Sequence, residues 1–164
     1  MSTIRFIADL HFGHANMAIK RGFLSPEEHD EHIIKKWNNT VSKRDVTYIL
    51  GDLSMEKKSP YHLLSRLNGV KHVVLGNHDR HQDVAELLKH VHSVSGMIKY
   101  KGFWLTHCPV HPVELERVYG NIHGHVHENI INEPKYFCVS CENVDYTPRT
   151  FEELNIKIPT KTNK

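Results

Sequence analysis

The sequence has no long hydrophobic run, few cysteines and almost no net charge. None of its apolar stretches approaches the eighteen or so consecutive residues that a membrane-spanning helix needs. The first residues, MSTIRFIADLHF, lack the basic segment and long apolar segment of a secretory signal. A formal net charge of +2 is too small to favour nucleic acid on electrostatic grounds alone. We therefore expect a cytoplasmic protein with no membrane contact, for which nucleic acid is not the favoured partner.

The three cysteines are an odd number, which fits a reducing compartment better than a disulfide scaffold. Cys138 and Cys141 have the spacing of half a zinc knuckle, but the chain has no second pair. The surrounding sequence, FCVSC, favours a strand, in which residues three apart face opposite sides. We interpret this pair as small buried hydrophobic residues, with Cys108 left over.

Histidine, in contrast, is abundant. The chain has fifteen histidines in 164 residues, while its apolar content of 39% and charged content of 24% are ordinary for a globular protein. Histidine is the commonest metal ligand in proteins. Composition alone does not separate metal chemistry from biased usage, so the positions of the histidines must decide.

Short apolar runs alternate with helical patterns, which predicts an α/β domain with mixed sheets. Strands are expected at residues 3–8, 46–50, 72–75 and 137–140, and a hairpin from residues 94–100 and 102–107. Helices are expected after the SPEE signature at residues 25–28, after Ser59, and near residues 84–88, 114–118 and 150–154. We place one domain at residues 1–158 and a C-terminal tail at residues 159–164.

Polar side chains that bind metals follow the predicted strands. They are Asp9 and His11 after the first run, Asp52 after the second, Asn77 and His78 after the third, His107 after the fourth, and His125 and His127 after a weaker fifth. In open α/β sheets, ligands bind beyond the carboxyl ends of the strands. Each fragment alone is weak, because GNHD also fits a simple turn and an HxH pair is often just exposed.

Taken in order, the fragments D-x-H, GD, GNHD, an isolated histidine and GHxH resemble the calcineurin-like metallophosphoesterase superfamily. The resemblance spans Asp9 to His127. The local sequences DLHFGH, THCP and YGNIHGHVH are similar to those of small single-domain phosphoesterases of bacteria and phages. The resemblance implies a four-layer α/β sandwich, with two mixed β-sheets flanked by helices and the site at the carboxyl ends of the strands.

The resemblance also implies two divalent metal ions per chain. The residues that match the motif would divide into Asp9, His11 and His127 for one ion, Asn77, His107 and His125 for the other, and Asp52 as the bridge. Such a mixed shell of carboxylate, amide and imidazole ligands fits several metals. We expect manganese, with iron, zinc, nickel and cobalt also compatible.

The reaction implied is hydrolysis of a phosphate ester by in-line attack of a metal-bridging hydroxide. In this scheme His78 protonates the leaving oxygen, and Asp79 holds the imidazole of His78. His14 and Arg80 are candidate substrate contacts, and a structural role is equally open for both. Most of the remaining histidines are expected at the surface, and for His123 we favour packing within a strand.

The expected substrate is a small phosphate ester or a nucleotide. Related protein phosphatases extend the second motif to GDxxDRG, whose arginine helps to hold a dianionic monoester. This chain has GDLSME at residues 51–56 and lacks that arginine. Loss of a bidentate arginine contact weakens binding of a dianionic monoester more than that of a monoanionic diester, so we expect phosphodiesters to be the better substrates.

Three alternatives within the same fold stay open: a phosphomonoesterase or nucleotidase, a DNA-processing nuclease, and a non-catalytic scaffold. Nucleases built on this domain carry added segments for which 164 residues leave no room, and scaffolds have lost ligands that are all present here. An HD phosphohydrolase, suggested by His78-Asp79, is all-helical, whereas this dipeptide follows a β-rich run. The sequence does not predict the oligomeric state.

Overall fold

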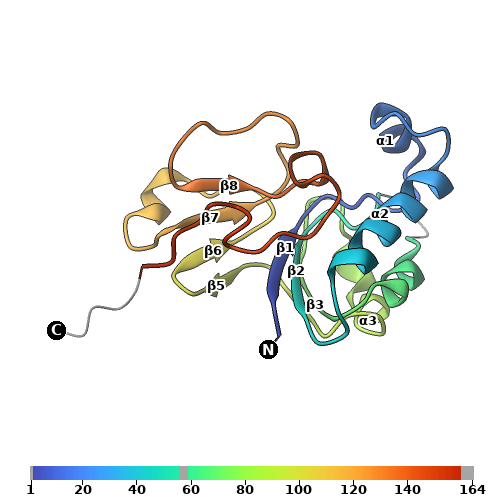
Figure 1. Ribbon diagram of the computed structural model, residues 1–164, viewed down its shortest axis with the longest axis horizontal. Helices are drawn as coiled ribbons and strands as arrows, with labels where there is room; N and C mark the ends of the chain where they lie inside the picture. The colour runs from blue at the N-terminus through green and yellow to red at the C-terminus, as the bar shows by residue number, and fades with distance from the viewer. Residues whose placement is uncertain (1, 56–58, 160–164) are drawn as a thin grey trace.

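Two four-stranded sheets lie next to each other in the middle of the molecule (Figure 1). The computed structural model describes residues 2–55 and 59–159. The first sheet has the order β1 (Ile4–Ile7), β2 (Val46–Leu50), β3 (Val70–Val74), β4 (Ser93–Ser95), and all its neighbours are parallel. The second has the order β5 (Ile98–Tyr100), β6 (Phe103–Leu105), β7 (Gly120–His123), β8 (Tyr136–Cys138), with only β5 and β6 antiparallel.

The α-helices lie on the side of the first sheet that faces away from the second (Figure 1). They are α1 (Ala15–Lys20), α2 (Pro26–Thr40) and α3 (Val84–Leu87). Short 3₁₀ helices complete the fold: η1 (Tyr61–Arg66), η2 (His81–Asp83), η3 (Pro112–Leu115) and η4 (Cys141–Val144). The expected α/β architecture of two sheets flanked by helices is confirmed. None of the described helices has both the length and the apolar character needed to cross a membrane.

Helix α2 begins where the SPEE signature predicts. The hydroxyl of Ser25 accepts the backbone N–H of Glu28 at 3.1 Å, and proline occupies the first turn, where its missing N–H costs nothing. The apolar face of the helix, which includes Ile33 and Trp37, is buried against the first sheet's core. This packing holds the first sheet from outside and leaves the ends of its strands open.

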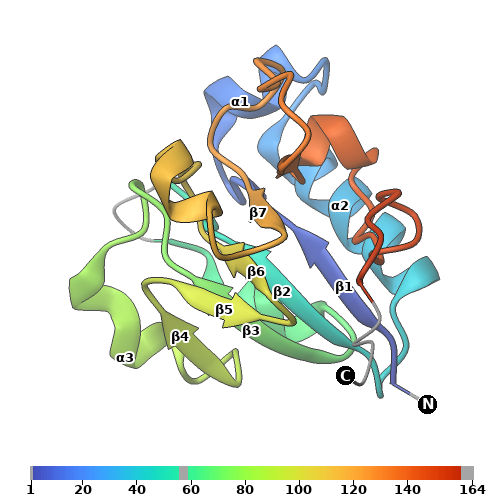
Figure 2. The same cartoon turned by 90° about the vertical axis from the view of Figure 1, so that its left-hand side faces the viewer.

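Aromatic side chains join the two sheets into one core. The ring of Phe151 packs edge-on against Phe6 of β1, with 4.8 Å between ring centroids, and lies 5.4 Å from Phe103 of β6. Beyond β1, the backbone of Ala8 pairs with Ser140, which follows β8. Strands β1, β6 and β7 all point toward the upper side of Figure 2. The carboxyl ends of both sheets therefore meet along one face of the molecule.

The apolar run at residues 94–100 is divided between the two sheets, which the sequence did not predict. Val94 pairs with Val73 in the first sheet, whereas Ile98 pairs with Leu105 in the second. Gly96 lies between the two short strands. The hairpin itself is confirmed from β5 to β6, and its turn is formed by residues 101 and 102, which both have positive φ.

Other local expectations also change in the structure. The helix after Ser59 is a 3₁₀ helix, and helix α1 was not anticipated. Residues 150–154 form a single turn, because Asn155 adopts a left-handed φ of 56° that ends it and Phe151 is drawn into the core. Of the expected tail at residues 159–164, all but Pro159 lies outside the described residues.

Candidate metal centre

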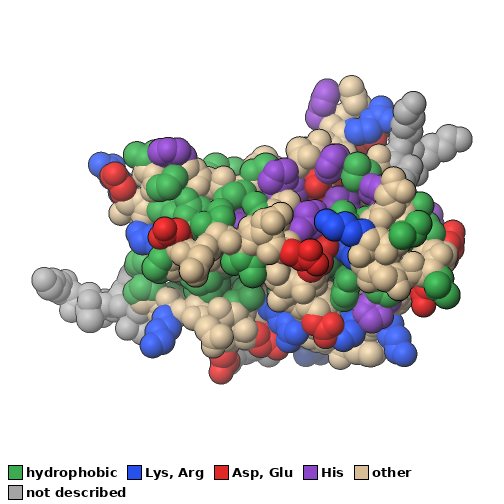
Figure 3. All heavy atoms as spheres, turned by 90° about the horizontal axis from the view of Figure 1, so that it is seen from above, with side chains coloured by type: hydrophobic (Ala, Val, Ile, Leu, Met, Phe, Trp, Pro, Cys, Tyr) green, Lys and Arg blue, Asp and Glu red, His purple; other side chains and the backbone are tan. Residues whose placement is uncertain are grey.

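The candidate metal ligands converge at the carboxyl ends of both sheets. Asp9 and His11 follow β1, Asp52 follows β2, Asn77 follows β3, His107 follows β6, and His125 and His127 follow β7. Seen from above this face, histidine side chains gather near the middle of the molecule (Figure 3). Residues up to 118 positions apart in the sequence, from Asp9 to His127, thus share one site.

The first group of ligands surrounds the carboxylate of Asp9. Its Oδ1 lies 4.0 Å from Nε2 of His11 and 3.9 Å from Nε2 of His127. Donor atoms that share one ion, each about 2.0–2.2 Å from it, lie about 3–4 Å from one another. These spacings are too long for hydrogen bonds and suit three ligands of one cation.

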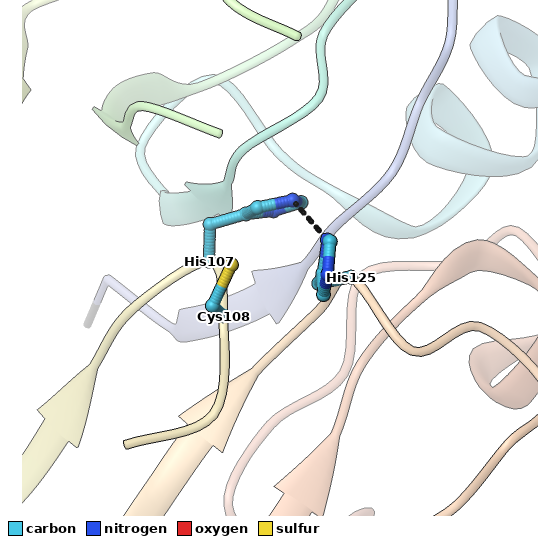
Figure 4. A group of neighbouring side chains, drawn as sticks. All are labelled: His107, Cys108 and His125. Carbon is cyan, nitrogen blue, oxygen red and sulfur yellow. Dashed lines mark hydrogen bonds between the residues drawn. The ribbon is translucent and has the colours of Figure 1, made fainter. Parts of the chain in front are cut away.

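The second group surrounds Nε2 of His107. This nitrogen lies 2.9 Å from Oδ1 of Asn77 and 3.2 Å from Nδ1 of His125. The other ring nitrogen of His107 donates to the carbonyl of Leu50 at 2.8 Å, so in the neutral form of the ring, which a metal ion requires, the lone pair is on Nε2 and faces the site. Figure 4 shows Cys108 beside these two histidines, and its Sγ lies within 4.8 Å of a ring nitrogen of each.

Asp52 lies between the two groups. Its Oδ2 is 3.8 Å from Nε2 of His11 and 3.3 Å from Nε2 of His107. Its Oδ1 accepts the backbone N–H of His78 at 3.0 Å. Burial alone raises the pKa of Asp52, but the hydrogen bond and charge of His107 and the N–H of His78 outweigh it, and the net shift is downward. Asp52 is therefore ionised at neutral pH and faces both groups with one oxygen.

The buried imidazole of His11 shows that this cluster suits a cation. The residue is 1% exposed, and within the described part of the chain neither ring nitrogen has a hydrogen-bond partner. Burial, followed by the charge of Arg21, lowers the pKa of His11 to about 3, so the ring is neutral and has a free lone pair. An unpaired buried polar group is costly, and a metal ion beside Asp9 and Asp52 would remove that cost.

The backbone is strained at most of the candidate ligands. Five of the seven have a left-handed backbone: Asp9 (φ 60°), His11 (49°), Asp52 (52°), His125 (70°) and His127 (49°). Such conformations cost about 1–3 kcal/mol each in residues other than glycine and cluster at functional sites. Each one turns the chain sharply just beyond a strand, which directs the side chain into the site.

Two glycines allow the strand ends to approach each other this closely. A Cβ atom on Gly124 would lie 2.5 Å from Oδ2 of Asp9, and one on Gly76 would overlap the Asp52 carboxylate. Any larger residue would push the ligand away. The backbone N–H of His125 also donates to Oδ2 of Asp9, at 3.0 Å, which fixes the two strand ends together.

A second layer of buried side chains holds the first group of ligands. Nδ1 of His127 lies 3.1 Å from Oε1 of Glu142, which also accepts Nε–H of Arg21 at 2.8 Å. The guanidinium of Arg21 continues to the backbone carbonyl of Asp9 at 2.8 Å. Ser140 donates its hydroxyl to Oδ2 of Asp9 at 2.6 Å. The carboxylate on its far side orients the imidazole of His127 and fixes its tautomer.

His78 and Asp79 have different environments. The His78 side chain is 39% exposed, and its Nε2 lies 3.9 Å from Oδ2 of Asp52. Asp79 was expected to hold this imidazole, but its carboxylate instead accepts the backbone N–H groups of Gly76 and Asp52, both at 2.8 Å, and of Leu53 at 2.9 Å. The aspartate is buried and three backbone donors surround it, so it fixes the loop that carries Asp52.

The two candidate substrate contacts both have structural partners. Nδ1 of His14 accepts the N–H of Met17 at 3.4 Å and caps helix α1, while its ring lies 5.8 Å from that of His11. Arg80 is exposed and pairs with Asp83 at 3.6 Å. His123 is fully buried in β7, as expected for a packing role. Cys141 is buried, Cys138 is half-buried, and both are free thiols.

Four residues of the site were not identified from the sequence: Cys108, Ser140, Glu142 and Arg21. Cys108 follows His107 directly, and this adjacency to a candidate ligand is the sequence feature that could have identified it. Glu142 and Arg21 belong to no motif, and they reach the site only because the segment after β8 packs beside β1.

A family model described as calcineurin-like phosphoesterase matches residues 2–157. The chain belongs to the calcineurin-like phosphoesterase family. Calcineurin-like phosphoesterases are hydrolases of phosphate esters that generally use two metal ions, and the groups around Asp9 and His107 are candidate metal-ligand clusters in this chain.

Three known proteins resemble the chain to different extents. An uncharacterized protein of Methanocaldococcus jannaschii, MJ1445, is 35% identical, and the alignment covers 98% of this chain and 93% of that protein. The Gene 66 protein of Mycobacterium phage D29 is 42% identical, over 49% of this chain and 42% of its own length. A solved structure, the protein of unknown function AQ665 from Aquifex aeolicus, has a TM-score of 0.74 at 23% identity, covering 94% of this chain and 98% of that one, and shows the same fold.

Proposed function

We propose that the protein is a phosphoesterase that needs two divalent cations and hydrolyses phosphodiesters in preference to monoesters. The observation that carries this proposal is the position of Asp52. One of its carboxylate oxygens faces Nε2 of His11 at 3.8 Å and Nε2 of His107 at 3.3 Å. A single oxygen shared by two ligand groups is what a bridging carboxylate requires.

The same geometry supports the proposed ligand sets. Asp9, His11 and His127 would hold one cation, Asn77, His107 and His125 would hold the other, and Asp52 would contact both. Two such cations acidify a water molecule and stabilise the entering and leaving oxygens of an in-line displacement. The donor set suits borderline metals, and we favour manganese, with iron, zinc, nickel and cobalt as alternatives.

His78 is the residue that we assign to proton transfer. Its imidazole is half-exposed, its Nε2 lies 3.9 Å from the Asp52 carboxylate, and its backbone N–H is tied to the same carboxylate. The side chain can therefore reach a leaving oxygen at the edge of the centre while its backbone stays in place. Asp79 supports this step indirectly, because it fixes the backbone on both sides of Asp52 and Gly76.

The substrate class is a small phosphate ester or nucleotide, with a diester favoured. The second motif, residues 51–56, has no arginine to hold a dianionic phosphate. His14 and Arg80 stay candidates for outer contacts. A monoesterase, a nuclease and a scaffold are the alternatives, and the three free thiols support a cytoplasmic location.

Metal counting together with turnover tests the proposal. Protein stripped with a chelator and reloaded with manganese should bind two ions per chain by elemental analysis and hydrolyse bis(p-nitrophenyl) phosphate. Asp52→Asn should lose both ions and the activity, whereas Asp145→Asn, which changes an exposed carboxylate paired with Lys36, should lose neither. A single zinc ion that survives Asp52→Asn would contradict the two-metal centre. Two bound ions without any ester hydrolysis would favour the scaffold.

A further inference from the structure

A wide apolar groove opens beside the metal centre. It is lined by parts of residues 109–116 and 131–136 and has a volume of about 1000 Å³. Its walls are three prolines, at positions 109, 112 and 134, together with Val110, Ile131 and Tyr136. In the view from above, hydrophobic side chains cover the region of η3 and the segment before β8 and border the histidines (Figure 3).

The groove begins almost at the metal centre. Pro109 lies two residues after His107, and each step between neighbouring Cα atoms spans 3.8 Å, so the two Cα atoms are at most about 7.6 Å apart. The first wall of the groove therefore belongs to the segment that directly follows a candidate metal ligand.

Hydrogen bonds fix the groove to the strands that carry His107 and His125. The N–H of Val110 donates to Oδ1 of Asn121 at 2.9 Å, and the amide of Asn121 donates to Thr106 at 2.9 Å. On the other wall, the hydroxyl of Tyr136 donates to the carbonyl of Val110 at 2.8 Å. The ring of Tyr136 is thereby tied to the opposite wall, and hydrogen bonds join the groove to the strands that lead to His107 and His125.

The charges along the groove do not favour a second phosphate. Glu116 and Glu133 both line it, and within residues 2–55 and 59–159 neither carboxylate takes part in a hydrogen bond or ion pair. The lysine in the lining, Lys135, directs its ammonium group at the carbonyls of Leu115 and Val118, at 2.6 and 3.2 Å. His111, which also lines the groove, accepts the N–H of Val113 through Nδ1, so its Nε2–H is a donor. The two carboxylates are acceptors, which suit N–H donors.

We propose that this groove binds the base of a nucleotide ester whose phosphate lies at the metal centre, and that it prefers bases with an exocyclic amino group. The proline and tyrosine walls suit the apolar faces of a flat ring, and the glutamates suit an amino group at its edge. Thymine and uracil present carbonyl oxygens on that edge, which the carboxylates repel. This proposal rests on the proposed phosphoesterase function and names its substrate class.

The test compares three diesters that share one leaving group: the p-nitrophenyl 5′-phosphodiesters of deoxyadenosine and of thymidine, and methyl p-nitrophenyl phosphate, which has no base. The variant Ile131→Glu changes a wall of the groove. Val113→Glu is the control, because it introduces the same side chain on η3, which borders the groove, at a residue that is 55% exposed and is not part of the lining. A second variant, Glu116→Gln with Glu133→Gln, leaves the apolar walls intact.

In Ile131→Glu we expect the KM of the deoxyadenosine ester to rise about tenfold, the scale of one lost base-stacking contact, with kcat nearly unchanged. The methyl ester and the Val113→Glu control should not change. The double glutamine variant should reduce the preference for deoxyadenosine over thymidine. Deoxyadenosine alone should also bind the metal-free protein in saturation-transfer NMR, and Ile131→Glu should abolish that signal.

The outcomes separate the two proposals. If no ester is hydrolysed but deoxyadenosine still binds and Ile131→Glu abolishes binding, the phosphoesterase function is wrong and the groove assignment holds. If esters are hydrolysed but Ile131→Glu affects the methyl and deoxyadenosine esters equally, the groove assignment is wrong. A dimer in analytical ultracentrifugation that Ile131→Glu dissociates, without any effect of the base, would place a second copy of the chain in the groove and would also overturn it.

Discussion

Nδ1 of His127 lies 3.1 Å from Oε1 of Glu142, on the side of the ring away from Asp9. Burial alone would raise the pKa of Glu142, but the hydrogen bond with His127 and the charge of Arg21 outweigh it and lower the pKa to about 2. Glu142 is therefore a carboxylate at neutral pH, and the proton of His127 belongs on Nδ1. Nε2 is left with a lone pair that faces the Asp9 carboxylate, as a metal ligand needs.

This relationship predicts that Glu142→Gln weakens metal binding without removing a ligand. We expect the affinity for one of the two ions to fall about 10–100-fold, the usual effect of losing a carboxylate that orients a ligating histidine. Competition with a coloured chelator measures it. Glu128→Gln is the control, because Glu128 is an exposed carboxylate one residue after His127. Equal affinities in wild type and Glu142→Gln would contradict the role.

The same carboxylate predicts a dependence of stability on pH in the metal-free protein. The pKa of Glu142 falls from 4.5 to about 2 on folding, so the unfolded chain takes up the proton first as the solution is acidified. The stabilisation is complete above pH 4.5 and is lost as the pH falls toward 2. The difference in free energy of unfolding between wild type and Glu142→Gln, from urea denaturation, should shrink across that interval. A constant difference would mean that the pKa is not lowered.

The second motif predicts that diesters are better substrates than monoesters. Without an arginine at residues 51–56 to hold a dianion, kcat/KM should be higher for bis(p-nitrophenyl) phosphate than for p-nitrophenyl phosphate. Both substrates are measured with the same metal at neutral to mildly alkaline pH. A clear monoester preference would show that other groups, such as Arg80, supply the missing clamp.

A further prediction concerns His78 as the proton donor. In His78→Ala the metals should stay bound, because the ligands belong to other residues, and the loss of activity should grow with the basicity of the leaving group. General acid catalysis is typically worth about 10²–10⁴-fold when the departing oxygen is basic. A plot of log kcat/KM against leaving-group pKa should be steeper in the variant than in wild type, with exposed His81→Ala as the control. Parallel lines with intact metals would leave His78 with electrostatic stabilisation only.

A substitution at Gly124 tests how closely the strand ends pack at the candidate metal centre. A methyl group there would meet Ala8 and the Asp9 carboxylate at 2.5 Å, so Gly124→Ala should destabilise the protein by about 1–3 kcal/mol and weaken metal binding. Gly96→Ala is the matched control, because nothing lies within 4 Å of the added atom. Thermal unfolding with and without metal measures both effects. Similar behaviour of the two variants would mean that the strand ends can move apart.

The positions of the candidate ligands at the strand ends could be predicted because they depend on local sequence. A polar residue directly after a buried strand lies at the sheet's carboxyl edge whichever way the rest of the chain runs. Asp9, Asp52 and His107 follow this rule. Helix α2 was predictable for a similar reason, since Ser25 caps its own helix three residues away.

The parts that could not be predicted depend on distant packing. Residues 94–100 have the pattern of one strand, and only their separate partners in two sheets divide them. Asp79 lies next to His78 in the sequence, yet its oxygens are taken by backbone donors up to 27 residues away. Arg21 and Glu142 are separated by 121 positions, and the spacing of residues along the sequence does not predict a contact between residues so far apart.

The pairing of Ala8 with Ser140 has a consequence for the order in which the molecule assembles. Asp9 receives hydrogen bonds from residues 116 and 131 positions later, so its partners are among the last parts of the domain to leave the ribosome. The N-terminal strands can fold earlier, but they supply only some of the candidate metal ligands. Contacts of such long sequence separation slow folding. Cation binding should therefore require contact between the segment at Asp9 and the segment at Ser140. Its rate in a refolding experiment should match the slowest step of folding.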